Sequence, residues 1–297
     1  MSKGFRRVSA RSRVSQASAK RILEVIKEKP SISDENATVN EVKDGSIEFK
    51  NVSFRYEGAS LPTINNASFK INSGEMVGII GATGSAKSSL VQLIPRLYDV
   101  NEGQVKVGGV NVKDYKIHAL REEVSMVLQK NVLFSGTIAE NLRWGNKNAT
   151  DEELVAACEI ADAHNFVSSF PDGYNTDLSQ GGVNVSGGQK QRLCIARAIL
   201  KKPKILILDD STSAVDTFTD SKIRTGLRAC IPETTKIISA QRISSVADCD
   251  KIIILEEGGI NDIGTHEELL SRNEIYKDIY ESQQKGSDDF DIVGGGE

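Results

Sequence analysis

One stretch decides the fold of this sequence: Gly81-Ala82-Thr83-Gly84-Ser85-Ala86-Lys87-Ser88-Ser89. The apolar run 76–80 before it predicts a buried strand, and residues 90–94 after it can continue as a helix. A strand, a loop of small residues and a helix are the setting of a phosphate-binding loop, which points backbone N–H groups, a helix N-terminus and a lysine at a polyphosphate. Lys87 can contact the phosphates, and the hydroxyl of Ser88 can bind Mg²⁺.

One position in this loop departs from the usual pattern. Such loops have glycine directly before the lysine, and this sequence has Ala86 there. Glycine permits a positive φ and lets the backbone approach the phosphates closely. We therefore expect the methyl group of Ala86 to strain the loop or to crowd the ligand. The competing interpretation of the stretch alone is an ordinary strand-to-helix turn with a chance lysine.

The composition is that of an ordinary soluble protein of one or two domains, with 297 residues, 39% hydrophobic and 26% charged. The net charge of −4 argues against nucleic-acid binding, which usually leaves a basic footprint. The four cysteines are widely spaced and the histidines are not clustered, which favours free thiols in a reducing cytosol. No apolar run approaches the roughly 20 residues that a transmembrane helix needs.

Residues 1–45 form a segment ahead of the expected domain. The segment opens with a basic arm and has no acidic residue before Glu24. Such an arm is either solvated or attracted to anionic lipid. A helical pattern over 18–29 stops at Pro30, and the polar residues 31–43 are expected to be a linker.

The folded domain is expected over 46–284 and belongs to the α/β class, with a parallel core sheet, an antiparallel β-subdomain and an inserted α-helical block at about 130–200. The acidic, glycine-rich residues 285–297 are expected to be disordered. Buried parallel strands are expected where apolar residues follow one another, and half-exposed strands where apolar and polar residues alternate. The expected strands are 47–56, 67–71, 76–80, 104–107, 124–128, 205–208, 236–239 and 251–255, and a terminal helix is expected over 265–283.

Polar residues follow the carboxyl ends of the parallel strands, where open α/β sheets bind their ligands. Gln129, Asp209, Asp210 and Gln241 lie at such ends, as does the loop that starts at Gly81. A hydroxyl-bound Mg²⁺ requires a carboxylate from its opposite side, and Asp209 at the end of a strand can supply it. The loop and this carboxylate together predict a site for a nucleotide with its Mg²⁺.

A third motif, Val185-Ser186-Gly187-Gly188-Gln189-Lys190-Gln191-Arg192, resembles the signature motif of ATP-binding cassette (ABC) proteins. The resemblance covers residues 46 to about 283. It implies a P-loop NTPase fold with a RecA-like core, the cofactors ATP and Mg²⁺, and an ATPase whose hydrolysis is coupled to transport.

The resemblance also assigns roles to single residues. It implies that Tyr56 stacks on adenine and that Gln129 lies in the Q-loop, where it joins Ser88 and Asp209 around Mg²⁺. It implies that Asp210 and Gln241 occupy the positions of the water-polarising and γ-phosphate-contacting residues. The D-loop would be Ser213-Ala214-Val215-Asp216.

Within the family, three stretches resemble exporters rather than importers. Residues 133–138 and Gly181-Gly182 are similar to exporter motifs, and residues 17–32 are similar to the segment after the last transmembrane helix of a half-transporter. The resemblance implies a domain at the cytoplasmic face of a membrane, working with transmembrane domains. It further implies that a second nucleotide-binding domain pairs with this one, each signature motif meeting the γ-phosphate held by the other.

Three residues depart from the family pattern in this chain's own ATP site: Ala86 for glycine, Asp210 for glutamate and Gln241 for histidine. Aspartate is one methylene shorter than glutamate, which withdraws its oxygens by about 1.5 Å. Glutamine cannot carry a proton as histidine does. Only Val185 departs from the signature motif, where leucine is commoner. The chain thus resembles the degenerate-site subunit of a heterodimeric multidrug-type exporter, whose partner supplies the consensus glutamate and histidine.

Three alternatives stay open. The first is a fully active homodimeric exporter ATPase. The second is a non-catalytic nucleotide-binding scaffold in which Ala86 abolishes ATP binding. The third is a soluble ABC ATPase of DNA repair or translation, against which the exporter-like stretches and the absence of a basic patch argue.

Overall fold

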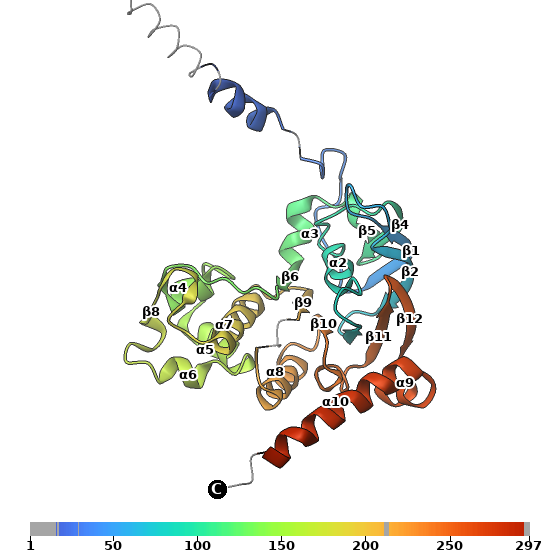
Figure 1. The fold of residues 1–297 in the computed structure, drawn as a ribbon. Coiled ribbons are helices and arrows are strands. Elements are labelled where there is room, and N and C mark those ends of the chain that lie inside the picture. Colours follow the sequence, from blue (N-terminus) through green and yellow to red (C-terminus); the bar gives the residue numbers. More distant parts are fainter. Residues whose placement is uncertain (1–15, 17, 29, 211–213, 294–297) are drawn as a thin grey trace, which may run out of the picture. The chain divides into compact units, whose positions relative to one another are not determined.

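The computed structural model describes residues 16, 18–28, 30–210 and 214–293, with side chains described as far as residue 284. The chain divides into two compact units, Met1–Glu35 and Asn36–Glu297. The first unit contains a helix over 18–27, close to the helical pattern expected over 18–29, and its residues are exposed (Figure 1). The expected basic arm, with its cationic residues from Lys3 to Arg13, lies outside the described residues.

The second unit begins earlier than the expected domain start at residue 46. Val42 is fully buried, and Val39 forms a β-bridge with Tyr115. Part of the expected linker is therefore packed against the domain, because burial of its apolar side chains outweighs the polar character of the surrounding residues.

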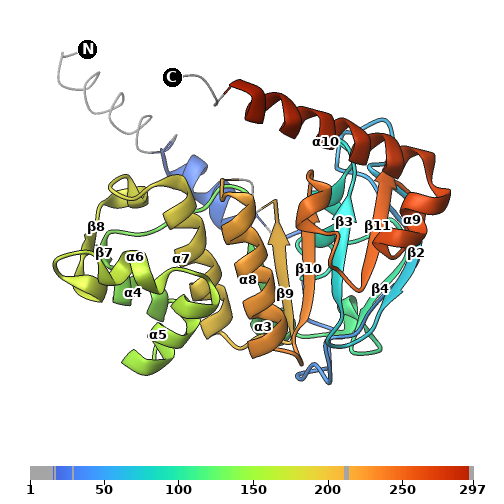
Figure 2. The same ribbon diagram turned by 90° about the horizontal axis from the view of Figure 1, so that it is seen from below.

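A sheet of six strands in the order β12-β11-β3-β10-β9-β6 forms the centre of this unit (Figures 1 and 2). All neighbours are parallel except β12, which runs antiparallel at the edge. The strands are β3 (Met76–Ile80), β6 (Val124–Val127), β9 (Ile205–Asp209), β10 (Thr235–Ala240), β11 (Lys251–Glu256) and β12 (Gly259–Gly264). Strand β12 was not expected from the sequence, because its glycines, Asn261 and Asp262 are poor strand formers.

The core sheet lies between two hydrophobic clusters. In β3, Met76 and Ile80 belong to the cluster shared with the helical block, while Val77 and Ile79 belong to the other. Successive strand residues point to opposite faces, so a strand covered on both faces is apolar throughout. This double burial explains why β3, β9 and β10 could be recognised from uninterrupted or nearly uninterrupted apolar runs.

A second sheet is antiparallel, in the order β2-β1-β4-β5. Its strands are β1 (Ile47–Phe54), β2 (Ile64–Ile71), β4 (Glu102–Val107) and β5 (Val110–Asn111). Phe49 and Phe69 stack at 4.5 Å between ring centroids across β1 and β2. The expected antiparallel subdomain is therefore present.

The block inserted after β6 is helical, as expected, and it also contains a small ribbon of β7 (Gly136–Thr137) and β8 (Asp177–Leu178). Capping boxes begin three of its helices, at Thr137, Thr150 and Ser186. Figure 1 shows this block on the side of the core sheet where β6 lies. The helices of the second unit are α2 (Lys87–Gln92), α3 (Ile117–Glu123), α4 (Ile138–Arg143), α5 (Asp151–Ile160), α6 (His164–Ser168), α7 (Gly187–Leu200), α8 (Thr217–Cys230), α9 (His266–Arg272) and α10 (Glu274–Val293), with 3₁₀ turns η1 (Val112–Asp114), η2 (Gly173–Asn175), η3 (Gln180–Gly182) and η4 (Ile243–Ser245).

The C-terminal region differs from the expected single helix over 265–283. The helix is broken at Asn273, which has φ −107° and ψ 110°, into α9 and α10. The Asn273 side chain accepts a hydrogen bond from the Tyr276 backbone N at 2.9 Å and so begins α10. Helix α10 continues to Val293, although disorder was expected from residue 285. No proline interrupts that stretch, and one glycine costs a helix only about 1 kcal/mol.

No helix in the described part of the chain is long and apolar enough to cross a membrane.

Candidate nucleotide site

The phosphate loop connects the end of β3 to the start of α2. Ala86 immediately precedes α2 and has φ 74° and ψ 17°, a left-handed conformation. For a residue with a Cβ this conformation costs roughly 1–2 kcal/mol. The expected strain is therefore present. At Gly81 an added Cβ would collide with the Leu255 carbonyl oxygen, so glycine is required there for close packing.

Lys87, the first residue of α2, is buried against the loop. Its Nζ donates hydrogen bonds to the carbonyl oxygens of Gly81 at 2.5 Å and Ala82 at 3.0 Å. Burial lowers the pKa of Lys87, and the nearby carboxylates of Asp210 and Asp209 partly oppose that effect. The loop thus holds an ammonium group where a polyphosphate would neutralise it.

Ser88 and Asp209 meet across the site. Ser88 Oγ donates to Asp209 Oδ1 at 3.1 Å, and Asp209 is buried at the last position of β9. A hydroxyl and a carboxylate are hard oxygen donors of the kind that Mg²⁺ prefers. The pair confirms that the two predicted motifs converge, and its chemistry fits a magnesium ion.

Asp210 accepts hydrogen bonds from two glutamines, which follow β6 and β10, the strands on either side of β9. Gln129 Nε2 donates to Asp210 Oδ2 at 2.9 Å, and Gln241 Nε2 donates to the same oxygen at 3.1 Å. The Asp210 backbone N donates to the Ser239 carbonyl oxygen at 2.9 Å, and Asp210 has a φ of 47°. The three residues expected to perform catalysis therefore form one cluster.

These groups line a common pocket of about 290 Å³. Two of its hydroxyls, Ser85 Oγ and Ser239 Oγ, are buried and have no hydrogen-bond partner among the described residues. Buried polar groups require partners, and phosphate oxygens are suitable acceptors. The residues present thus fit a polyphosphate. The pocket is lined by Thr63, Thr83, Gly84, Ser85, Ala86, Lys87, Ser88, Ser89, Gln129, Asp209, Asp210, Ser239 and Gln241.

Two lining residues, Thr63 and Ser239, were not singled out from the sequence. Ser239 could have been recognised as a polar residue near the carboxyl end of a buried strand. Thr63 carries no such signal, because it reaches the pocket only through the pairing of the antiparallel sheet, where its backbone N donates to Phe54 O at 2.7 Å.

Tyr56, expected to stack on adenine, lies outside this lining but beside α2. Its hydroxyl shares a hydrogen bond of 2.9 Å with Ser89 Oγ. Its ring contacts Phe54 and Tyr98 edge-on, with centroid distances of 4.8 and 5.1 Å. The ring is thus held next to the phosphate loop, and its stacking on a base stays a prediction.

The signature motif is at the start of α7. Ser186 Oγ accepts from Gln189 N at 3.2 Å, and Gln189 Oε1 accepts from Ser186 N at 3.0 Å. Ser186 and Gly187 are exposed, and Val185 packs against the hydrophobic cluster. The residues of the motif are not among those that line the phosphate pocket. The motif therefore presents a helix N-terminus to a different surface.

The described part of the stretch expected to be the D-loop lies against this helix start. An added Cβ at Gly188 would come within 3.0 Å of the Ala214 carbonyl oxygen. Val215 is buried, and its carbonyl oxygen accepts from Arg242 Nη2 at 3.2 Å. Asp216 begins α8, and its bond from Thr219 N lowers the pKa of its carboxyl. Ser213 lies outside the described residues.

Comparison with known proteins shows which family the chain is similar to. A family model described as ABC transporter matches residues 64–213, about half of the chain. The Bacillus subtilis protein named "Putative multidrug export ATP-binding/permease protein YgaD" is 42% identical over 268 residues, which cover 90% of this chain and 46% of that protein. "ABC transporter B family member 2" of Dictyostelium discoideum is 41% identical over 254 residues, covering 85% of this chain and 18% of that protein.

A solved structure is also similar. "Structure of a bacterial Atm1-family ABC exporter with ATP bound" matches with a TM-score of 0.86 and 33% identity, covering 91% of this chain and 47% of that one. The chain spans about half the length of the bacterial relatives it matches. Membership in one family explains the phosphate loop, the convergent Asp209 and the signature helix together. The chain belongs to the ABC transporter family and contains a nucleotide-binding domain of that family.

Proposed function

We propose that this chain is the ATP-binding subunit of an ABC exporter and that its own ATP site holds the nucleotide more than it hydrolyses it. The names of the similar proteins, a multidrug export ATP-binding/permease protein and an ATP-bound Atm1-family exporter, support the exporter class. The pocket around Lys87, Ser88 and Asp209 supports binding of ATP with Mg²⁺.

The observation that supports weak hydrolysis is that two side-chain amides donate hydrogen bonds to the Asp210 carboxylate. A carboxylate oxygen has two lone-pair directions, and on Oδ2 the amides of Gln129 and Gln241 fill both. An attacking water would therefore have to give its proton to the other oxygen of a side chain that is one methylene shorter than glutamate. A well-placed general base contributes about 10²–10⁴-fold, and a shorter side chain with an engaged oxygen loses much of this.

Each remaining group has a role in holding the nucleotide. Lys87 and the backbone N–H groups at the start of α2 would bind phosphate oxygens, and Tyr56 would pack on the base. Mg²⁺ between Ser88 and Asp209 would neutralise phosphate charge. Gln241 can donate a hydrogen bond toward the terminal phosphate but cannot relay a proton.

The exposed signature helix is proposed to serve a partner. Ser186 and Gly187 are solvent-exposed at the N-terminus of α7, where an anion is favoured. A second nucleotide-binding domain with consensus glutamate and histidine would place its ATP there. Closure of the two domains around nucleotide would then drive the transmembrane domains at the cytoplasmic face of the membrane.

Steady-state ATPase activity tests this proposal. We expect the unmodified domain to bind a fluorescent ATP analogue and to turn over slowly, and the Asp210→Glu plus Gln241→His variant to turn over at least about tenfold faster. Brisk turnover of the unmodified domain would instead support the homodimeric, fully active alternative. Absence of ATP binding that Ala86→Gly restores would support the scaffold alternative.

A further inference from the structure

The C-terminal helix α10 contacts the loop that follows β10. Gln283 Nε2 donates to the carbonyl oxygen of Gln241 at 2.8 Å, and Gln283 Oε1 accepts from the backbone N of Ile243 at 2.8 Å. One side-chain amide thus bonds to the backbone on both sides of Arg242. Both bonds go to the main chain, so they hold the path of the loop whatever side chains it carries.

The held loop reaches the nucleotide pocket directly. Gln241 lines the pocket, and its side chain donates to Asp210 Oδ2 at 3.1 Å. Helix α10 also approaches the pocket from the phosphate loop: Ile275 and Ile279 line a neighbouring cavity of about 340 Å³ together with residues 81–85. Figure 2 shows α10 running across one end of the core sheet, and the cavity identifies it as the end that carries the phosphate loop.

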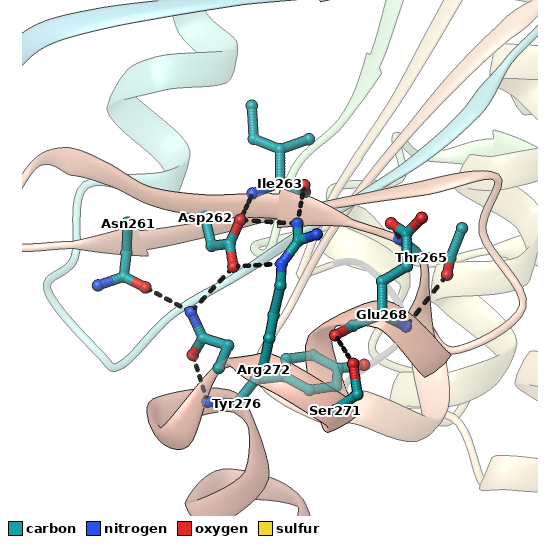
Figure 3. Close-up of polar contacts among 9 residues, drawn as sticks. Asn261, Asp262, Ile263, Thr265, Glu268, Ser271, Arg272 and Tyr276 are labelled. Atoms are coloured by element: carbon teal, nitrogen blue, oxygen red, sulfur yellow. Dashed lines mark hydrogen bonds and ion pairs between the residues drawn. The ribbon is translucent and has the colours of Figure 1, made fainter.

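Hydrogen bonds and burial fix the start of α10 on the domain, and Gln283 lies further along the same helix. Arg272 bonds to both carboxylate oxygens of Asp262 on β12, at 3.0 and 3.1 Å, and to the Ile263 carbonyl oxygen at 2.8 Å (Figure 3). Tyr276 is fully buried and bonds to His266 at 2.8 Å. Gln283 follows seven residues later, about two helical turns along the same face.

We propose that Gln283 is a positioning residue: through its two backbone bonds, α10 holds Gln241 at the terminal-phosphate side of the pocket. The proposal rests on the proposed ATP-binding function. It makes the C-terminal helix part of the nucleotide site, so that an event that detaches α10 weakens the discrimination between ATP and ADP. A merely structural helix would affect stability without changing that discrimination.

The test uses the full chain and follows backbone amide hydrogen exchange in wild type, Gln283→Ala and the matched control Ser282→Ala, an exposed neighbour on α10. We expect Ile243 to exchange about tenfold faster in Gln283→Ala, because the acceptor of its N–H is removed, and to be unchanged in Ser282→Ala. Unchanged exchange of Ile243 in Gln283→Ala would overturn the proposal.

Equilibrium binding of fluorescent ATP and ADP analogues to the same variants completes the test. We expect the preference for ATP over ADP to fall about fivefold in Gln283→Ala, with ADP affinity and Ser282→Ala unaffected. Gln283→Glu keeps the acceptor but loses the donor, so it should retain protection of Ile243 and still lose the preference.

A preference unchanged in Gln283→Ala overturns the positioning role. Failure of the wild type to bind either analogue overturns the proposed function itself, and the exchange of Ile243 still decides whether Gln283 holds the loop.

Discussion

At the scale of single residues, the departures from the family pattern have separate structural consequences. The sequence alone predicts strain at Ala86, because the position before the lysine requires a positive φ, and the structure confirms it with φ 74°. The meeting of Gln129, Asp210 and Gln241 could be predicted only as three strand ends at one sheet edge. The hydrogen bonds from both amides to Asp210 Oδ2 could not be predicted, because they depend on side-chain conformations that residue spacing in the sequence does not determine.

Replacing Ala86 with glycine should stabilise the domain. The change relieves the left-handed strain of about 1–2 kcal/mol, while glycine makes the unfolded chain more favourable by about 0.4–1 kcal/mol. Ala82→Gly in the same loop is the matched control, because Ala82 has no positive φ and its change affects mainly the unfolded state. Urea unfolding should place the Ala86 variant about 1–2 kcal/mol above the Ala82 variant. Equal midpoints would show that Ala86 is unstrained.

Lys236, a buried lysine that does not line the pocket, predicts a pH dependence of stability. Burial lowers the pKa of Lys236 to about 8 from 10.5, with Arg228 adding to the effect and Asp250 and Glu233 opposing it. Below pH 8 the folded chain must bury an ammonium, whereas the unfolded chain keeps its proton up to about pH 10.5. Stability should therefore rise with pH between these values.

Lys236→Met tests this dependence by removing the titrating group from the same packed position. The variant should be more stable than wild type at pH 7, by the order of 1–3 kcal/mol, and the difference should shrink as the pH rises toward 10. Comparison of the two chains cancels the opposite effect of Tyr276, whose pKa is raised by burial. A difference that is constant from pH 7 to pH 10 would contradict the prediction.

At the scale of elements, the start of one helix could be predicted from the sequence and the break in another could not. The capping box at Thr150 could be predicted because Glu153 stands at the required spacing, and both bonds are present. The break at Asn273 could not, because helical spacing of apolar residues continues through it. Its physical cause is tertiary: Asn273 also donates to Asn261 on β12 at 2.7 Å. Strand β12 itself exists through pairing with β11 rather than through its own propensity.

Asn273→Ala should loosen α10 from the domain. The variant loses the cap on Tyr276 N and the bond to Asn261, which together are worth about 1–2 kcal/mol. Thermal unfolding should show this loss, and amides at the start of α10 should exchange faster. Asn148→Ala is a control, since the Asn148 side chain is exposed in the loop before α5, and no such loss is expected there. Protection of α10 that equals wild type would contradict the prediction.

At the scale of the whole molecule, the proposed signature–partner contact makes a prediction about mixed chains. One chain would carry Ala86→Gly, Asp210→Glu and Gln241→His together with Gly187→Glu, which places a negative charge at the start of α7 and should repel phosphate. This chain alone should be inactive, having a restored site but no usable signature. Adding the unmodified chain should raise ATP hydrolysis about tenfold or more, because its signature completes the restored site.

The control for that mixture is the unmodified chain with Ser186→Ala, which removes the hydroxyl at the exposed helix start. It should stimulate markedly less. Equal stimulation by both chains would contradict a role of this motif in the partner's site.

The central proposal is that this chain retains ATP that it does not efficiently hydrolyse. The most direct measurement is single-turnover conversion of radiolabelled ATP to ADP with the protein in excess over nucleotide and Mg²⁺ present. We predict that the unmodified chain keeps its bound nucleotide as ATP while the Asp210→Glu plus Gln241→His variant converts it at least about tenfold faster. Conversion at the same rate by both chains would contradict the proposal.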